Sequence, residues 1–562
     1  MDVSEGAILL GGYAAKQCPV RTQLDFGPTP AVWVPAPEDQ ARLDAGIAFE
    51  AEVFAELRAR HPGAVLVDPD ARRQEAICAT VAAMDAGAPM ILGGWLPDDV
   101  GGARKGRPDI LVGVSGGYLP ADVKHHRTLE SKAKKSACIA TLDDPAAWQQ
   151  VGGWSAATGY RVSDGLQLAH YAAMLRACGR HPGPHLQWGA VLGTSRIATG
   201  AELGWVFTWH DLTEPLGFTF SRSRGKARRS LMERYDHEHG FRVKVAAAAR
   251  QAAAGPGRRL LVEPVGQPEC RTCPYQQTCV DQMGPDEPSV ALTVGGLDVR
   301  EWVALRRLGV TTIAELADLD LTDAAVFDTY HREVSHRGRD HVRSRLAGAI
   351  TRAGMIRDGI PLLRTATTPI PAGDLEIDCD IEWSADGLVY LWGARVRLAG
   401  NETTATFVPF VDWAVHDAAG ERLLAERFAH WVRGLRDTAA LAGRSVRVYH
   451  WSPAESSRLR RILGAAADDL LDPDTGVFCD LEQVFNTNFL SVHGSSIKVV
   501  APIFGFTWRA QDAGGALSQT YLEAVRAGQD QASQARRWLL EYNADDTAAL
   551  ASIRDGMTNF CR

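Results

Sequence analysis

The stretch RPDILVGVSGGYLPADVKHH, residues 107–126, decides how the first half of the chain is interpreted. Two apolar runs flank a Gly-Gly pair, a pattern that predicts two antiparallel strands joined by a tight turn. A two-residue turn at positions 116–117 would place Asp109 directly opposite Lys124. Asp122 lies two residues before Lys124, so its side chain is expected on the same face of the hairpin. The sequence therefore predicts that two carboxylates and one amine converge.

This predicted constellation has the chemistry of a metal site. Carboxylate oxygens are the ligands that Mg²⁺ or Mn²⁺ prefers, and Lys124 would orient the attacking water and offset phosphate charge. Pro120 is a warning, because proline belongs on edge strands or at bulges, and a one-residue bulge would turn part of this face. The alternative is a surface hairpin that carries an incidental Asp and Lys pair.

The order of the motifs resembles that of the RecB-like nucleases. RPDILV, a turn and ADVK resemble the PD-(D/E)xK nuclease core. GIAFE, which ends at Glu50, resembles the first motif of the RecB-like branch, and QLAHY, with Gln167 and Tyr171, resembles its QxxxY signature. The resemblance implies a restriction-endonuclease-like core in which these three residues join the hairpin groups in the catalytic site, with Glu50 as a metal ligand. Taken singly, Glu50 also fits an exposed helix charge and Tyr171 a core aromatic.

The cysteines suggest a second kind of site. A chain without an export signal is expected to keep its ten cysteines reduced, so clustered ones are interpreted as metal ligands. Cys270, Cys273 and Cys279 form C-x2-C-x5-C, and Cys18 stands far upstream. Four thiolates suit Zn²⁺ or an iron-sulfur cluster. One distant cysteine followed by a trio resembles RecB-like nucleases with a 4Fe-4S cluster, which implies that these four bind such a cluster, with Zn²⁺ as the alternative. The other six cysteines are interpreted as buried free thiols.

A second acidic pattern lies near the C-terminal end. In LEIDCDIEW, Asp380 and Glu382 are two apart and Asp378 precedes them, so all three would share one face of a strand. In the helical pattern around YNADD, Tyr542 and Asp546 are four apart and share a face. An acidic pair on a first strand followed by YxxxD resembles the DnaQ-like exonucleases, and VYLWG fits their YprB-like relatives. This resemblance implies a ribonuclease-H-like domain in which carboxylates hold two metal ions and the tyrosine helps to place the water.

The pattern departs from that family at the middle acid. An aspartate after an Asn-led motif is expected, yet VYHWSPAESS offers Glu455 as a metal ligand. Ser452, Pro453 and Glu455 also fit a helix capping box, which would tie the glutamate to a backbone N–H. Asp480 is a weaker substitute. Metal binding and capping both stay open, so this domain is expected either to cleave or only to bind nucleic acid. The intact first constellation is expected to carry the main cleavage activity.

Two turn-rich seams divide the chain, one near residues 283–289 and one ending at Asp374. They predict a nuclease domain at 1–285, a helical linker at 290–365 and a ribonuclease-H-like domain at 372–562. The linker pattern breaks at one glycine and resembles a helix-hairpin-helix element, which grips nucleic-acid backbone; a plain spacer is the favoured alternative. The expected fold class is thus an α/β multidomain protein.

Charge and composition bear on partners. The net charge of −8 argues against a protein covered in positive potential. Residues 124–135 and 221–229 are nevertheless basic, which suits phosphate contacts or a solvated surface. The acidic N-terminus resembles neither a signal peptide nor a membrane anchor, so a cytoplasmic protein without a membrane partner is expected. No P-loop motif GxxxxGK(S/T) occurs, so no ATP use is expected, and any helicase would be a separate partner.

Together these patterns predict a divalent-metal-dependent nuclease or exonuclease. The expected substrate is nucleic acid, above all DNA as single strands or ends, in repair, recombination or defence. The non-enzymatic rival is an inactivated scaffold that binds nucleic acid or a partner protein around a structural metal cluster. A redox protein is disfavoured, because no GxGxxG motif after a strand supplies a second cofactor site.

Overall fold

The computed structural model of the chain divides into two compact units. The first comprises residues 1–264 and 268–282, and the second comprises residues 265–267 and 283–562. No helix in the described part of the chain is long and apolar enough to cross a membrane. The structure describes residues 6–560 apart from 200–201, 222–224, 254–260, 293, 295, 335–336, 386, 510–514 and 529–530.

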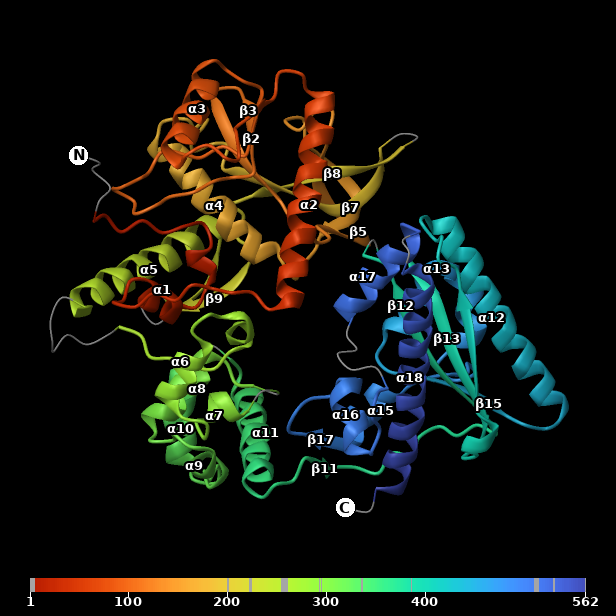
Figure 1. The fold of residues 1–562 in the computed structure, drawn as a ribbon. Coiled ribbons are helices and arrows are strands. Elements are labelled where there is room, and N and C mark those ends of the chain that lie inside the picture. Colours follow the sequence, from red (N-terminus) through yellow and green to blue (C-terminus); the bar gives the residue numbers. More distant parts are fainter. Residues whose placement is uncertain are drawn as a thin grey trace. The chain divides into compact units, whose positions relative to one another are not determined.

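The first unit is built on a mixed eight-stranded sheet with the order β1-β2-β3-β4-β7-β8-β5-β6. Strand β4 runs antiparallel to β3 and parallel to β7, so the chain crosses over between β4 and β7. Helix α4 lies in that crossover and packs against both strands (Figure 1). The strands are β1 (Val65–Leu66), β2 (Met90–Leu92), β3 (Ile110–Val114), β4 (Gly117–Val123), β5 (Leu129–Thr141), β6 (Gln149–Ala156), β7 (Trp188–Thr199), β8 (Glu202–Asp211) and the separate hairpin β9 (Gly217–Ser221) and β10 (Gly225–Arg229). The helices are η1 (Ala14–Lys16), α1 (Pro19–Asp25), α2 (Pro37–Arg60), α3 (Arg73–Asp85), α4 (Arg161–Ala177), α5 (Leu231–Ala253), η2 (Pro268–Thr272) and α6 (Gln276–Met283).

Helices α2 and α4 carry the motif residues Glu50, Gln167 and Tyr171. Helix α2 begins at Pro37, a position in the first turn where proline is well tolerated. It ends at Arg60, before a Pro-Gly break. Helix α4 ends before Gly179, whose φ of +70° lies in the left-handed region that glycine favours.

The hairpin of β3 and β4 has a different register from the predicted one. Val114 pairs with Gly117, so the turn lies one residue earlier than predicted. The same ladder, continued to its base, places Asp109 opposite Asp122 instead of Lys124. This change of two residues in pairing keeps every side chain on its expected face, because faces alternate along a strand with a period of two.

The second unit begins with a helical segment that has its own apolar core, which includes Trp302, Phe327 and Leu346. A break at Gly309, with φ of +85°, separates two short helices as the sequence predicts. Both helices begin with a capping box, which fixes where each one starts. The helices of this segment are α7 (Pro288–Ala291), α8 (Val299–Arg307), α9 (Ile313–Ala317), α10 (Ala324–Glu333) and α11 (Arg339–Arg357).

A five-stranded sheet with the order β14-β13-β12-β15-β16 follows. Strands β12, β13 and β14 are antiparallel neighbours. Strand β15 pairs in parallel with β12, and β16 pairs in parallel with β15. Strand β12 coincides with the predicted strand LEIDCDIEW. The strands of this part are β11 (Leu362–Arg364), β12 (Leu375–Trp383), β13 (Val389–Leu398), β14 (Thr406–Val411), β15 (Val446–His450), β16 (Phe478–Asp480) and β17 (Phe489–Ser491). The helices are η3 (Glu402–Thr404), α12 (Ala418–Leu441), α13 (Ala454–Leu463), η4 (Gly464–Ala467), α14 (Asp468–Leu471), α15 (Leu481–Asn488), α16 (Ile497–Ile503), α17 (Gly515–Arg526) and α18 (Ala532–Asn559).

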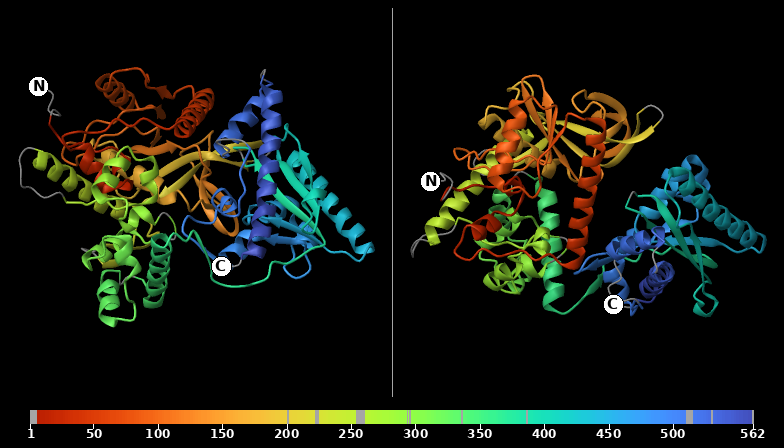
Figure 2. Two further views of the ribbon diagram at one scale, coloured as in Figure 1. Left: turned by 60° about the horizontal axis from the view of Figure 1, so that its bottom comes forward. Right: turned by 45° about the horizontal axis from the view of Figure 1, so that its top comes forward.

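Helices α12 and α18 cover opposite faces of this sheet, as Figures 1 and 2 show. On β13, Trp392 stacks on Phe428 of α12, with ring centroids 4.7 Å apart. Its neighbour Gly393 points the other way, toward Asn543 of α18. Gly393 pairs with Asp380 on β12, so α18 covers the face that carries the predicted acidic residues.

Candidate active sites

Asp109, Asp122 and Lys124 meet at the base of the β3–β4 hairpin. The Lys124 Nζ lies 3.0 Å from Asp122 Oδ2, and the Val123 N–H donates to Asp109 Oδ2 at 2.8 Å. Asp122 is fully buried, and its Oδ1 has no hydrogen-bond partner among the described residues. No register shift interrupts the ladder at Pro120, so the bulge that would turn this face is absent from β4. The three groups therefore lie together despite the altered register.

Burial and mutual charge perturb these groups. Burial and the neighbouring Asp122 raise the pKa of Asp109 well above its usual range. Burial disfavours the charged form of Lys124, but Asp122 and Asp109 outweigh it and raise the pKa of Lys124. Burial also raises the pKa of Glu50 on α2, against the opposing charges of Arg107 and Lys124. Glu50 therefore lies near the hairpin, although the described structure does not bring its carboxylate and the two aspartates within 4.8 Å of one another.

Gln167 and Tyr171 face this constellation from α4. The Gln167 Nε2 donates to the Tyr171 hydroxyl at 3.0 Å, as their spacing of one helical turn allows. Burial, together with the charges of Asp122 and Asp109, raises the pKa of Tyr171. The pair thus lies beside the hairpin carboxylates and not in a remote part of the core.

Two residues near the N-terminus extend the constellation and were not predicted. The Lys16 Nζ donates to Gln167 Oε1 at 3.0 Å. The Tyr13 ring centroid lies 4.2 Å from the Lys16 Nζ and 5.9 Å from the Lys124 Nζ. Burial and the charge of Lys124 lower the pKa of Lys16 to about 8. Lys16 directly precedes the Gln-Cys-Pro stretch that resembles the upstream cysteine motif, but that motif does not indicate a contact with Gln167, which lies 151 residues away in the chain.

A second acidic group forms on the C-terminal sheet. Asp380 and Glu382 lie two residues apart on one face of β12, and Asp546 comes from α18. One carboxylate oxygen of each lies within 4.8 Å of the others. Among the described residues, no other set of three His, Cys, Asp or Glu side chains meets this distance. This is the spacing that a divalent cation with carboxylate ligands requires.

Burial and mutual repulsion disfavour the charged forms of these carboxylates. Burial and the nearby Asp546 raise the pKa of Asp380 well above its usual range, and they raise the pKa of Glu382 to about 8. Burial also raises the pKa of Asp546, against the opposing charge of Lys498. A divalent cation would relieve this repulsion, and three hard carboxylate oxygens are its preferred donors. The residues present therefore fit Mg²⁺ or Mn²⁺.

Polar side chains hold two of the carboxylates in place. The Asn543 Nδ2 donates to Asp380 Oδ2 at 2.7 Å. The Lys498 Nζ lies 2.6 Å from Asp546 Oδ1, and the Trp508 Nε1 donates to the same oxygen at 2.7 Å. None of these three residues was predicted. Asn543 follows directly after the predicted tyrosine, so the same motif could have indicated it. Lys498 and Trp508 come from a segment without a recognised motif.

Tyr542 lies one helical turn before Asp546, as predicted, and its hydroxyl interacts with that carboxylate. Its ring stacks on Trp538, with centroids 5.1 Å apart. Burial and the charge of Asp546 raise the pKa of Tyr542, so its hydroxyl is protonated at neutral pH.

Glu455 does not form the capping box that its sequence allows. Ser452 takes a left-handed conformation with φ of +91°, and α13 begins one residue later than the box requires, with Pro453 at the N-cap. Glu455 is buried, and its Oε2 lies 3.4 Å from His450 Nδ1. Its charge contributes to the raised pKa of Asp380, so it lies near the acidic group. The capping interpretation is therefore wrong, and Glu455 is available as an additional ligand.

Asp480, the weaker substitute for the middle acid, is occupied elsewhere. It is the N-cap of α15, where its Oδ1 accepts the Gln483 N–H at 3.0 Å. Its carboxylate therefore satisfies a helix end, and Glu455 is the better candidate for the missing position.

Comparison with known proteins decides the nature of the C-terminal part. Residues 379–558 match the family model described as RNase H superfamily. The second unit contains an RNase H superfamily domain. The matched range covers Asp380, Glu382, Glu455, Tyr542 and Asp546. No curated protein and no solved structure matches the chain.

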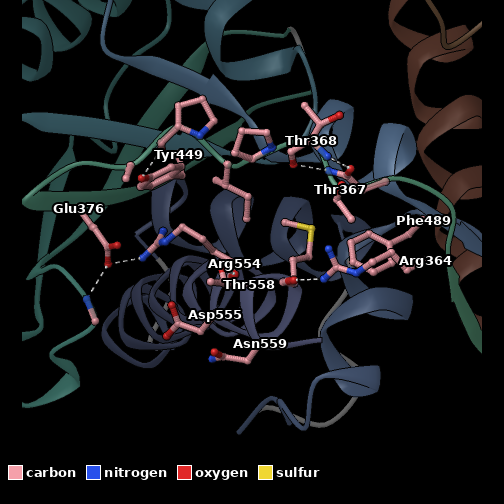
Figure 3. A pocket seen from close by; sticks show the side chains of 17 residues that line it. Arg364, Thr367, Thr368, Glu376, Tyr449, Phe489, Arg554, Asp555, Thr558 and Asn559 are labelled. Carbon is pink, nitrogen blue, oxygen red and sulfur yellow. Dashed lines mark hydrogen bonds and ion pairs between the residues drawn. The ribbon is translucent and has the colours of Figure 1, made fainter. Parts of the chain in front are cut away.

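Asp378 shares the predicted strand face in this RNase H domain but is not available as a ligand. It is fully buried and accepts hydrogen bonds from Arg554, which also donates to Glu376 at 2.8 Å. Glu376 and Arg554 line a cavity of about 560 Å³ toward the start of β12 (Figure 3). Arg364, which also lines the cavity, donates to the Met557 carbonyl at 2.5 Å. Both cations thus interact within the protein, and the cavity is separate from the acidic group.

The four predicted cluster cysteines lie in one region of the first unit but are not drawn together. Burial and the charges of the other three raise the pKa of Cys279 to about 11. The Cys18 N–H donates to Glu269 Oε1 at 2.6 Å, which ties the upstream cysteine to the segment of the trio. Among the described residues, however, no three of these sulfur atoms lie within 4.8 Å of one another, so no metal cluster is evident. Of the six remaining cysteines, Cys78 is exposed instead of buried, and Cys561 lies outside the described residues.

The two basic runs lie mostly on strands of the first unit. Lys132, Lys134 and Lys135 are exposed on β5, and Lys132 is 3.1 Å from Glu130. In the second run, residues 222–224 lie outside the described residues, and Arg229 donates to groups within the β9–β10 hairpin.

Proposed function

We propose that the protein is a divalent-metal-dependent nuclease with a catalytic centre in its RNase H domain. The observation that carries this proposal is the convergence of Asp380, Glu382 and Asp546 within a domain of that superfamily. These three residues, with Glu455 as a further ligand, would hold Mg²⁺ or Mn²⁺. Bound there, the metal would polarise the scissile phosphate and lower the pKa of the attacking water.

The residues of the chain have distinct parts in this proposal. Asn543 fixes the orientation of Asp380, so that one oxygen stays directed at the metal position. The protonated hydroxyl of Tyr542 would orient the water for attack. The substrate is nucleic acid, and we propose DNA as single strands or ends, bound through phosphate contacts that do not depend on sequence. A separate helicase would supply such strands, and the protein would act in the cytoplasm.

We further propose that the first unit contains a second, RecB-like catalytic centre. This proposal is supported by Asp122, which is fully buried beside Lys124 and has one carboxylate oxygen without a hydrogen-bond partner in the described structure. A buried carboxylate of this kind is costly unless a cation completes its surroundings. Residues 1–285 would then form one nuclease domain, with a 4Fe-4S cluster on its four cysteines and the helical segment as a linker to the RNase H domain.

Cleavage assays of single variants test both centres. Purified protein would be incubated with Mn²⁺ or Mg²⁺ and end-labelled single- and double-stranded DNA and RNA, with EDTA as the negative control. If both centres act, Asp380→Asn and Asp122→Asn should each remove part of the products, and the double variant should remove all of them. Binding without metal-dependent cleavage by the unmodified protein would favour the inactive scaffold instead.

A further inference from the structure

Lys498 lies at the rim of the acidic group of the RNase H domain and has no part in the predicted chemistry. Its Nζ is 2.6 Å from Asp546 Oδ1, and its side chain is 33% exposed, whereas that of Asp546 is 7% exposed. An ammonium group has three donors, and this contact uses one of them. The Lys498 side chain is therefore partly open to solvent beside a carboxylate that is almost fully buried, and two of its donors remain for a further partner.

Two aromatic rings hold this cation. The Lys498 Nζ lies 4.0 Å from the ring centroid of Trp508 and 4.4 Å from that of Tyr542. Each ring face attracts a cation, so the pair restricts where the ammonium can move. The side chain is thus preorganised, which a lysine on an open surface is not.

The segment that supplies Trp508 is itself anchored to α18. The Trp508 Nε1 donates to Asp546, and the Trp508 ring packs edge-on against Phe506 with centroids 4.9 Å apart. The next residue, Arg509, donates to Asp545 from its backbone N–H at 3.0 Å and from its Nε at 2.7 Å. The lysine and its aromatic support are therefore fixed to the same helix as the acidic ligand.

Charge favours a substrate phosphate as the further partner of Lys498. Three carboxylates crowd this site, and a phosphodiester adds another negative charge that bound metal alone would have to offset. A preorganised ammonium beside the metal ligands is suited to stabilise the charge that develops on the phosphate. The alternative is a structural role, in which Lys498 only reduces repulsion between the carboxylates.

We propose that Lys498 is a catalytic residue of the RNase H domain whose ammonium contacts a non-bridging oxygen of the scissile phosphate, held in position by Trp508 and Tyr542. This inference rests on the proposed function of the domain. In this inference the segment from Ile497 to Arg509 serves substrate binding, because it supplies Lys498 and the residues that fix its position.

The test uses the full chain with Asp122→Asn, so that cleavage reports on the RNase H domain. Single-turnover cleavage of a labelled single-stranded oligonucleotide is measured at saturating Mn²⁺ for Lys498→Met and Lys498→Arg. Arg537→Met, which removes an exposed cation elsewhere on α18, is the matched control. We expect Lys498→Met to lose about 10²-fold in rate, as for other groups that stabilise transition-state charge, and Lys498→Arg and the control to lose less than about tenfold.

A second measurement separates phosphate contact from a structural role. Binding is measured with Ca²⁺ in place of Mn²⁺, with a short oligonucleotide whose terminal linkage is either a phosphodiester or an uncharged methylphosphonate. The bound Ca²⁺ also favours the charged linkage, so the comparison between variants carries the test. The chain with Lys498 should prefer the charged linkage about tenfold more strongly than Lys498→Met does. A thermal melt of each variant identifies any loss of folding.

The outcomes distinguish failure of the inference from failure of the proposed function. If Asp380→Asn abolishes cleavage while Lys498→Met cleaves within threefold of its parent, the inference is overturned and the function stands. A preference for the charged linkage that is equally strong in Lys498→Met also overturns it, since the role of the lysine is then structural. If the Asp122→Asn chain has no activity, or adding Asp380→Asn leaves its activity unchanged, the proposed centre fails and the inference fails with it.

Discussion

At the scale of single residues, Glu455 is where local sequence and tertiary structure conflict most clearly. The Ser-Pro-Ala-Glu pattern predicts a capping box, but the left-handed Ser452 moves the helix start and leaves the carboxylate near Asp380. The local pattern identifies only the nearby backbone N–H with which the Glu455 carboxylate could form a hydrogen bond. Which bond forms depends on the turn between β15 and α13.

Exchanging Glu455 for glutamine tests its role as a ligand. Glu455→Gln should lower the cleavage rate and raise the Mn²⁺ concentration that half-maximal cleavage requires. Because Glu455 does not cap α13, the free energy of unfolding should not show the loss of about 1 kcal/mol that follows removal of a helix cap. Asp480→Ala is the matched control, since it removes a true cap and should lower the free energy of unfolding by about that amount while leaving cleavage intact. Metal titrations and urea unfolding measure both effects. A variant of Glu455 that loses stability but keeps full activity would contradict the ligand assignment.

The buried His210 makes the stability of the first unit depend on pH. Burial lowers its pKa to about 4, with the charge of Arg161 adding to the shift, from an unfolded value of 6.5. Between pH 6.5 and pH 4 the unfolded chain binds a proton at this histidine and the folded chain does not. The free energy of unfolding therefore falls as the pH drops from 6.5 toward 4. The slope from one such group is about 1.4 kcal/mol per pH unit.

Urea midpoints at pH 7, 5.5 and 4.5 measure this effect. His210→Gln should flatten the loss of stability below pH 6.5, although its stability at pH 7 is itself reduced by the change in packing. His185→Gln, at an exposed position, should leave the slope unchanged. Equal slopes for the unmodified chain and His210→Gln would show that this histidine is not buried in its neutral form.

At the scale of elements, the contact between β13 and α18 determines whether the acidic group forms. A Cβ on Gly393 would lie 1.6 Å from Asn543 Oδ1, and the Asn543 side chain is fully buried. Gly393→Ala should therefore displace Asn543 from Asp380, lower the free energy of unfolding by about 1–3 kcal/mol and reduce cleavage. Denaturant unfolding and cleavage rates check the two effects.

Gly434 provides the control for this exchange. It lies in α12, and a Cβ there would contact nothing within 4 Å. Gly434→Ala should leave cleavage unchanged and stabilise the helix by up to about 1 kcal/mol. Wild-type stability and activity in Gly393→Ala would mean that α18 packs less closely on β13 than the structure describes.

At the scale of the whole molecule, a metal site on Cys18 and the cysteines of the later trio would join the two ends of the first unit. Cys18 and Cys270 are separated by most of that unit, so a cluster that includes both would restrain the unfolded chain strongly. If the proposed 4Fe-4S cluster forms, anaerobically purified protein should contain iron and acid-labile sulfide, and Cys18→Ala should lose both along with folded yield. The exposed Cys78 serves as the control, because Cys78→Ala should lose neither. Stoichiometric zinc without iron would reject the iron-sulfur cluster and leave a four-cysteine zinc site.

The sequence by itself determined which side chains share a face. A period of two places Asp380 and Glu382 on one side of β12, and a period of 3.6 places Tyr542 and Asp546 on one side of α18. These relations are local, because they follow from the geometry of a single element. For the same reason, the residues of the β3–β4 hairpin converge although their register was predicted incorrectly.

Only the tertiary structure decided which of these faces meet and what else joins them. Asp546 reaches Asp380 because α18 docks where Gly393 leaves space. Lys498 joins the acidic group from a segment without a motif, and Lys16 reaches Gln167 from a segment whose pattern indicates only a cysteine site. Docking depends on packing between elements far apart in the chain, and turn geometry sets the register and the starts of helices. Periodicity along one element contains none of this information, which is why the acidic ligands could be predicted and the lysines beside them could not.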